Sequence, residues 1–265
     1  NCQVGTFLSY ATRRGHVFLD RRLYLPEEWS ADQARRAQAK VPEGVRFQTK
    51  PEQAAEMLEH AWAQGIPMRW VAGDEVYGES THLRDTIRQH GCGYVLAVRV
   101  NTRVWVQHAP GVTPAGSLGS VAEVAASWPD SHWQRLEVAP GEKGPRVYDW
   151  GYQRVHESRE GGFGPWVWLL ARRSVSQATE IAYYLAYAPS DTPLLTLAQV
   201  AASRYTVEQC IEEAKGETGL DEYEVRYWHS WYRHITLSMM AHAWLACLRA
   251  KAHEKKRAPN PSWQT

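Results

Sequence analysis

The sequence has few of the features that mark secreted, membrane-spanning or zinc-finger proteins. Only four cysteines occur in 265 residues, none in a Cys-x-x-Cys pair, and the eleven histidines form no Cys/His cluster with zinc spacing. Neither a disulfide framework nor a structural zinc is therefore expected. No apolar run approaches the roughly 18–20 residues that a spanning helix needs, and no charged-then-apolar leader opens the chain. We expect a cytoplasmic protein without membrane contact.

An excess of charge of one sign is also lacking. Lys and Arg total 30 against 29 for Asp and Glu, and 44% of the residues are hydrophobic. This composition is typical of a soluble globular protein, and it excludes a disordered tail or a basic DNA-coating protein. A DNA-binding surface would therefore have to be a local cluster of basic residues, since a protein with balanced total charge can still carry a basic groove.

The first hundred residues alternate between strand and helix signals. β-Branched and aromatic residues on both sides of a short turn with Gly15 predict a hairpin. Thr49 and Glu52 predict a capping box at the start of an amphipathic helix that ends at Gly65. The expected order is a hairpin (residues 4–10 and 16–24), a helix (from 49), a strand (66–72), a helix (79–90) and a strand (94–100).

Beyond residue 100 the pattern changes twice. Short segments broken by Pro and Gly, with several Trp residues, predict a mostly β insertion, and strand patterns return at 166–171 and 180–188. Helical patterns follow at 195–216 and 232–255. The predicted organisation is a core of residues 1–100, a β-rich insertion of 101–164, a second core part of 165–250 and a basic flexible tail of 251–265.

Two carboxylates stand at positions suited to chemistry. Asp74 follows an apolar strand, where α/β sheets often place their sites, although a lone Asp there is more often a turn or capping residue. Glu208 shares a helical stripe with Arg204, Glu212 and Lys215 at spacings of four, four and three. For such a stripe alone, a solvated ladder of ion pairs is the better interpretation.

Taken together, the two motifs indicate a family. The spacing Arg204-x3-Glu208-x6-Lys215 matches the signature Tyr-x2-Arg-x3-Glu-x6-Lys, with Ala201 at the Tyr position, and GDEVYG around Asp74 resembles the motif of a second catalytic Asp. The chain thus resembles bacterial insertion-sequence transposases of the DDE class, in particular the IS-four-like group and its seven-oh-one branch. The gap between the two carboxylates suits the β insertion of that group.

The resemblance implies an α/β fold with an RNase H-like mixed sheet flanked by helices, a missing first strand, and a mostly β insertion before the last catalytic helix. In the family, the first catalytic Asp stands on that first strand, upstream of the hairpin. We interpret Asp20 as a surface residue and not as its replacement. Without the first strand, we expect the hairpin either to be separated by a cleft from the strand at 68–72 or to pair with it.

The implied activity is metal-dependent DNA cleavage and strand transfer at insertion-sequence ends, inactive in this fragment because one ligand is missing. Asp74 and Glu208 would be catalytic and would bind two Mg²⁺ or Mn²⁺ ions. The implied partners are the double-stranded DNA of transposon ends and target, and further copies of the chain in a synaptic complex. The candidate DNA-binding residues are Arg204, Lys215, Arg226 and Arg233.

Two alternatives remain open at this stage. The chain could be a non-catalytic DNA-binding or domesticated remnant, or an RNase H-like nuclease without strand transfer. A metal site formed by His234 and His242 is rejected, because eight residues correspond to two helical turns.

Overall fold

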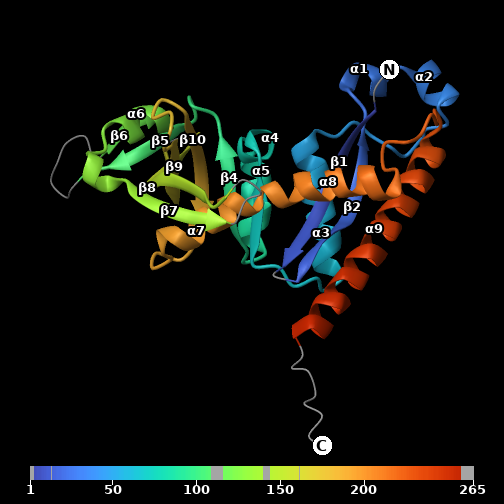
Figure 1. Cartoon of the computed structure of the whole chain (residues 1–265). Helices are drawn as coiled ribbons and strands as arrows, with labels where there is room; N and C mark the ends of the chain where they lie inside the picture. Colours follow the sequence, from blue (N-terminus) through green and yellow to red (C-terminus); the bar gives the residue numbers. More distant parts are fainter. Residues whose placement is uncertain (1–2, 13, 109–115, 140–143, 161, 258–265) are drawn as a thin grey trace, which may run out of the picture. The chain divides into compact units, whose positions relative to one another are not determined.

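A computed structural model describes residues 3–12, 14–108, 116–139, 144–160 and 162–257, with side chains to residue 252. The chain divides into two compact units (Figure 1). Unit 1 comprises residues 1–63 and 205–265, and unit 2 comprises residues 64–204. Among the described residues, no helix is long and apolar enough to cross a membrane.

Unit 1 is built on a two-stranded antiparallel hairpin of β1 (Val4–Thr12) and β2 (Gly15–Tyr24). Gly15 begins the return strand with φ of +148°, a backbone conformation that favours glycine. Successive side chains point to opposite faces: Thr6 donates to Gln53 on one side, and Phe7 packs into an apolar core on the other. The predicted hairpin is confirmed.

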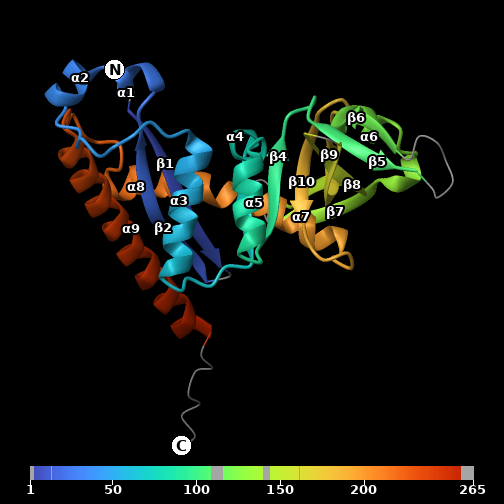
Figure 2. The same cartoon turned by 180° about the vertical axis from the view of Figure 1, so that it is seen from behind.

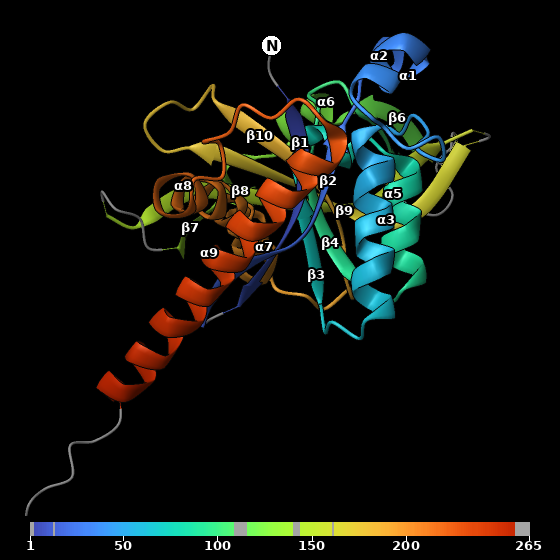
Figure 3. The same ribbon diagram turned by 90° about the vertical axis from the view of Figure 1, so that its right-hand side faces the viewer.

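Helices cover both faces of this hairpin. α3 (Lys50–Ala63) lies on one face, and α8 (Tyr205–Thr218) and α9 (Trp228–Arg257) lie on the other (Figures 1 and 2). α9 runs as one continuous helix (Figure 3). Two short helices, α1 (Glu27–Ala31) and α2 (Gln33–Gln38), follow the hairpin. The core between the hairpin and α8 and α9 consists of Phe18, Leu23, Cys210, Ala214, Leu220, Trp231, Ile235 and Met239.

The start of α3 follows from local sequence. Glu52 accepts a hydrogen bond from the Thr49 backbone N–H at 2.7 Å, and its own N–H reaches the Thr49 hydroxyl at 3.4 Å. This reciprocal pair is the predicted capping box, which satisfies two N–H groups that the first helical turn leaves unpaired.

Unit 2 contains an eight-stranded mixed sheet. Among the described strand pairs, only β3 and β4 are parallel to each other, and the remaining pairs are antiparallel. The order is β3-β4-β10-β9-β8-β5-β6, and β7 also pairs with β8. The strands are β3 (Trp70–Gly73), β4 (Gly93–Val98), β5 (Arg103–Gln107), β6 (Gly116–Ser120), β7 (Gln134–Ala139), β8 (Arg146–Arg159), β9 (Gly162–Ser174) and β10 (Ile181–Tyr187).

Helices also cover both faces of the large sheet near β4. Val95 packs in the core formed with α7 (Leu194–Ser203), whereas the neighbouring Tyr94 turns to the opposite face and bonds Arg88 of α5 (Thr81–Gln89). Because neighbouring residues in a strand alternate in direction, α5 and α7 lie on opposite faces. The remaining helices are α4 (Glu75–Gly78), α6 (Val121–Ala126) and a 3₁₀ turn at Asp130–His132.

The hairpin and the predicted core strands do not share a sheet. In the part of the chain that the structure describes, β1 and β2 pair only with each other, and β3 pairs only with β4. Of the two expected outcomes, pairing of the hairpin with the strand near residue 70 is therefore wrong. The hairpin folds within unit 1, where α3, α8 and α9 cover its faces, whereas β3 belongs to unit 2.

Four predicted elements differ in their bounds. The predicted strand at 66–72 is the shorter β3, and the predicted helix at 79–90 is the shorter α5, which begins after Ser80 because the Ser80 side chain caps it by accepting from the Leu83 N–H. The predicted helix at 195–216 is interrupted at Arg204, and the last helix begins earlier, at Trp228. Within the predicted tail, α9 extends to Arg257, and residues 258–265 lie outside the described residues.

Candidate functional site

Asp74 stands at the carboxyl end of β3, with its side chain exposed. Its Oδ1 accepts a hydrogen bond from the Val76 N–H at 2.9 Å and so caps α4. The capping role that sequence alone would favour is therefore present, and it fixes the orientation of the carboxylate. Tyr77 and Gly78, the last two residues of the GDEVYG motif, belong to the short helix α4 that follows.

Gly78 allows α4 to lie directly against β4. A Cβ atom at this position would overlap the carbonyl oxygen of Ala97. The backbone of α4 can approach the strand this closely only because glycine has no side chain. The Asp74 segment is thus held by β3, which precedes it, and by β4, against which α4 packs.

A buried group of charged side chains also holds the Asp74 segment in place. Arg84 of α5 donates to the carbonyl oxygen of Gly78 and, through Nε, to Oε1 of Glu157 at 3.1 Å. Arg88 and Arg159 donate to the same carboxylate at 2.7 and 2.6 Å, and so does the Tyr94 hydroxyl at 2.7 Å. Four donors thus surround a carboxylate whose residue is 1% exposed.

The neighbouring cations determine the ionisation of this carboxylate. Burial raises the pKa of Glu157, but the charges of Arg84 and Arg88 and the hydrogen bond from Tyr94 outweigh this effect, so the net pKa lies below its usual value. Burial also raises the pKa of Tyr94, and the Glu157 charge raises it further. Glu157 is therefore a carboxylate and Tyr94 a neutral donor at neutral pH.

Glu208 lies half-buried in the first turn of α8. Arg204 does not share this helix: it is the C-cap of α7 and the last residue of unit 2. The predicted stripe of four charges on one helix is therefore interrupted, because Arg204 closes α7 with a hydrogen bond from its N–H to Ala201 O before α8 begins. Lys215 is in the last turn of α8, and its Nζ atom lies 3.5 Å from Asp221 Oδ2.

The two candidate catalytic carboxylates belong to different units, Asp74 to unit 2 and Glu208 to unit 1. Their convergence on one metal site remains a prediction. Arg226 and Arg233, two further DNA-binding candidates, are exposed in unit 1.

Asp20 is not the surface residue that the sequence suggested. Its side chain is 15% exposed, and Oδ1 accepts from Arg22 Nη1 at 2.8 Å and from the Arg21 backbone N–H at 2.8 Å. The side chains of Arg21 and Arg22, on the same strand, fold back onto the carboxylate. Asp20 is therefore occupied by internal partners.

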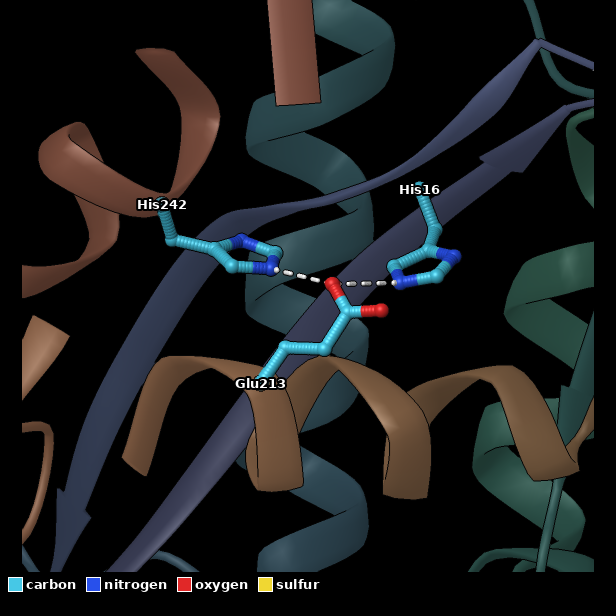
Figure 4. A group of neighbouring side chains, drawn as sticks. All are labelled: His16, Glu213 and His242. Carbon is cyan, nitrogen blue, oxygen red and sulfur yellow. Dashed lines mark hydrogen bonds and ion pairs between the residues drawn. The ribbon is translucent and has the colours of Figure 1, made fainter. Parts of the chain in front are cut away.

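A third group of polar side chains meets inside unit 1. The rings of His16 on β2 and His242 on α9 point at the carboxylate of Glu213 on α8 (Figure 4). Their Nε2 atoms lie 3.3 and 3.2 Å from Glu213 Oε2, and Arg249 Nη1 lies 3.0 Å from the same oxygen. Burial raises the pKa of Glu213, but the His242 hydrogen bond and the nearby His16 and Arg249 lower it below its usual value. His242 is fully buried.

Residues 1–139 match a family model described as DDE superfamily endonuclease. This match covers more than half of the chain. The chain belongs to the DDE superfamily of endonucleases. No curated protein matches it. Membership implies a DNA substrate, phosphodiester hydrolysis and divalent metal ions, as in the family generally.

Only some of the candidate residues of this DDE endonuclease lie within the matched region. It includes Asp74 and the α5 anchor at Arg84, and it ends before Glu157 and Glu208. The role of Glu208 therefore depends on its motif spacing alone. Glu157 and the group of His16, Glu213 and His242 were missed by sequence analysis, because their partners other than Arg159 are 29 to 197 residues away and no local spacing indicates them.

Proposed function

We propose that this DDE endonuclease is the catalytic domain of an insertion-sequence transposase of the IS-four-like group, which cuts the ends of its element and joins them to target DNA. The observation that carries the proposal is the placement of Asp74. It is an exposed carboxylate at the carboxyl end of β3, within the family match, on a segment fixed by α4, Gly78 and Arg84. A metal ligand needs such a fixed orientation.

The donor set fits a hard divalent cation. Asp74 and Glu208 offer carboxylate oxygens, which Mg²⁺ and Mn²⁺ prefer, and they would hold the two ions of the family's site. When bound, these ions supply activation of the attacking oxygen and neutralisation of charge on the leaving oxygen. In the RNase H-like arrangement that we propose, the family site has a third carboxylate, which is assigned to no residue of this chain.

The carboxylate of Asp74 is oriented before substrate binds. It accepts a hydrogen bond from the Val76 N–H, so it needs no reorganisation when the DNA arrives.

The other candidate residues contact the DNA. Arg204 and Lys215 would neutralise phosphates beside the site, and Arg226 and Arg233 would extend the contact along the duplex. Such contacts position the DNA without reading its sequence. A synaptic complex would bring two or more copies of the chain together.

The test is cleavage of a supercoiled plasmid that carries the DNA flanking the parent gene, with Mg²⁺, by the protein extended by any sequence that the parent gene encodes ahead of residue 1. We expect Asp74→Asn and Glu208→Gln to reduce cleavage by about a thousandfold or more, as expected for loss of a charge that stabilises the transition state. Asn retains an oxygen that can accept from Val76, so the cap survives and only the charge is lost.

Matched controls are Glu75→Gln, next to Asp74 on α4, and Glu212→Gln, one turn after Glu208 on α8. Both residues are exposed, and cleavage should stay within about twofold of wild type. Full activity of Asp74→Asn would contradict the assignment. Cleavage without joining to a target plasmid would favour a nuclease, and DNA binding without cleavage by the extended protein would favour a non-catalytic remnant.

A further inference from the structure

The group of His16, Glu213 and His242 is built from three elements that are far apart in the sequence. All three ligand atoms lie within 4.8 Å of one another. The separations of 3.2 and 3.3 Å between ring nitrogens and Glu213 Oε2 are close to the edge of about 3.4 Å that a tetrahedral ion with bonds of about 2.1 Å produces. Small movements of the side chains would therefore admit an ion between them.

We propose that His16, Glu213 and His242 bind one divalent ion of the Zn²⁺ class, with water as the fourth ligand. Two imidazoles and one carboxylate are a ligand set for Zn²⁺, Co²⁺ or Ni²⁺, whereas Mg²⁺ requires oxygen ligands. The site is distinct from the proposed catalytic pair in its chemistry, and it does not depend on the proposed function.

The burial of His242 supports a strong interaction at its Nε2 atom. The residue is fully buried, and its Nδ1 atom has no hydrogen-bond partner among the described residues. Burial of an imidazole with one unsatisfied nitrogen costs free energy in an apolar interior. Here the ring centroid of Phe18 lies 5.6 Å from that of His242. A metal bond would act at Nε2, where it would replace the hydrogen bond to Glu213 with a stronger interaction, and it would leave Nδ1 unpaired.

Arg249 is the competitor for Glu213 in the protein without metal. Its Nη1 lies 3.0 Å from Oε2, while its Nη2 lies 2.7 Å from Glu217 on the same helix as Glu213. The Arg249 side chain is 44% exposed, so it can leave Glu213 and keep its contact with Glu217. Metal binding would therefore exchange the Arg249–Glu213 ion pair and the two His–Glu213 hydrogen bonds for three metal bonds.

The ion would fix α8 to its neighbours. Glu213 follows Glu208 by five residues, about 7.5 Å along the helix axis and about 140° around it. Glu208 is therefore directed away from the ion, whereas the ion ties the helix that carries it to β2 and α9. We assign the site a structural role in holding this helix on the hairpin.

The test is titration of the full-length, chelator-stripped protein with ZnCl₂ by calorimetry, and with CoCl₂ by visible absorption. We expect one Zn²⁺ per chain with a Kd below about 10 μM, a tetrahedral Co²⁺ spectrum, and no displacement by excess MgCl₂. His16→Gln and His242→Gln should each weaken binding by about a hundredfold. His16 is half-buried, so the first variant decides the question if the second fails to fold.

Further variants distinguish this site from nonspecific binding of Zn²⁺ to surface histidines or to the catalytic carboxylates. His229→Gln removes an exposed histidine of α9 and should leave the affinity unchanged, as should Asp74→Asn and Glu208→Gln. Arg249→Gln should strengthen Zn²⁺ binding, because it removes the competing cation. Absence of binding by the stripped wild-type protein, or binding that persists in His16→Gln and His242→Gln, would overturn the proposal whether or not the protein cleaves DNA.

Discussion

At the scale of single residues, Gly78 shows how tightly the Asp74 segment is built. α4 lies so close to β4 that a Cβ at position 78 would overlap the Ala97 carbonyl oxygen. The hydrogen bond from Arg84 to Gly78 O holds the same backbone in place. The position of Asp74 is therefore set by backbone contacts that a single methyl group would disturb, and not by its own capping bond alone.

Replacement of Gly78 by Ala should lower the free energy of unfolding of unit 2 by about 2–3 kcal/mol, because α4 must move away from β4. It should also reduce cleavage by displacing Asp74. Thermal unfolding followed by circular dichroism measures the first effect. The control is Gly119→Ala, whose new Cβ would meet Val124 Cγ2 at an ordinary 3.5 Å and should leave the Tm unchanged or slightly higher. Equal Tm values for both variants would contradict the close approach.

At the scale of elements, the Glu157 carboxylate joins α5 to β8. Arg84 and Arg88 come from the helix, Arg159 from the strand that carries Glu157, and Tyr94 from β4. A buried carboxylate with four donors is costly to disrupt, because removal of its charge takes the carboxylate partner from the buried Arg84 and leaves Arg88 and Arg159 to share Asp85.

Glu157→Gln should therefore reduce the free energy of unfolding by about 3 kcal/mol at pH 7. The folded pKa of Glu157 lies below its usual value, so its charge stabilises the fold above the unfolded pKa of about 4.5 and ceases to do so as pH falls through the lower folded pKa. The difference between wild type and variant should shrink below pH 4. Urea unfolding at pH 7 and at decreasing pH measures it.

The exposed Glu137 on β7 is the matched control for Glu157. Glu137→Gln should change the free energy of unfolding by less than about 0.5 kcal/mol at every pH. A wild-type advantage over Glu157→Gln that stays constant down to pH 3 would show that packing, and not charge, produces the effect.

The sequence predicts those elements whose stabilising partners lie close by in the chain. The capping box of Thr49 and Glu52 and the hairpin around Gly15 depend on neighbours within a few residues, and both were predicted correctly. Whether this hairpin pairs with β3 was left open between two outcomes, because strand pairing depends on contacts between distant segments. The convergence of Asp74 and Glu208 stays a prediction, and the meeting of His16 with Glu213 had no local signal at all.

At the scale of the whole molecule, the two units differ in chain continuity. Unit 2 is a single segment, residues 64–204, and its main core draws only on residues within it. Unit 1 needs two segments, because α8 and α9, which cover one face of the hairpin, come from the end of the chain.

A fragment of residues 64–204 should therefore fold alone, with a cooperative thermal transition and dispersed amide resonances. A fragment of residues 1–63 should not, since it lacks α8 and α9 and exposes Phe18 and its apolar neighbours. Nuclear magnetic resonance and calorimetry of both fragments are the measurements. A non-cooperative transition in the 64–204 fragment would show that unit 2 depends on unit 1.

The split of unit 1 imposes an order on folding during protein synthesis. The hairpin and α3 leave the ribosome first, but the helices that cover them are made only after all of residues 64–204. At elongation rates of about 5–20 residues per second, this delay is on the order of 7–30 s. During that time Phe7 and Phe18 have no α8 or α9 to cover them, so the nascent hairpin is a natural client for a ribosome-associated chaperone until these two helices have been made.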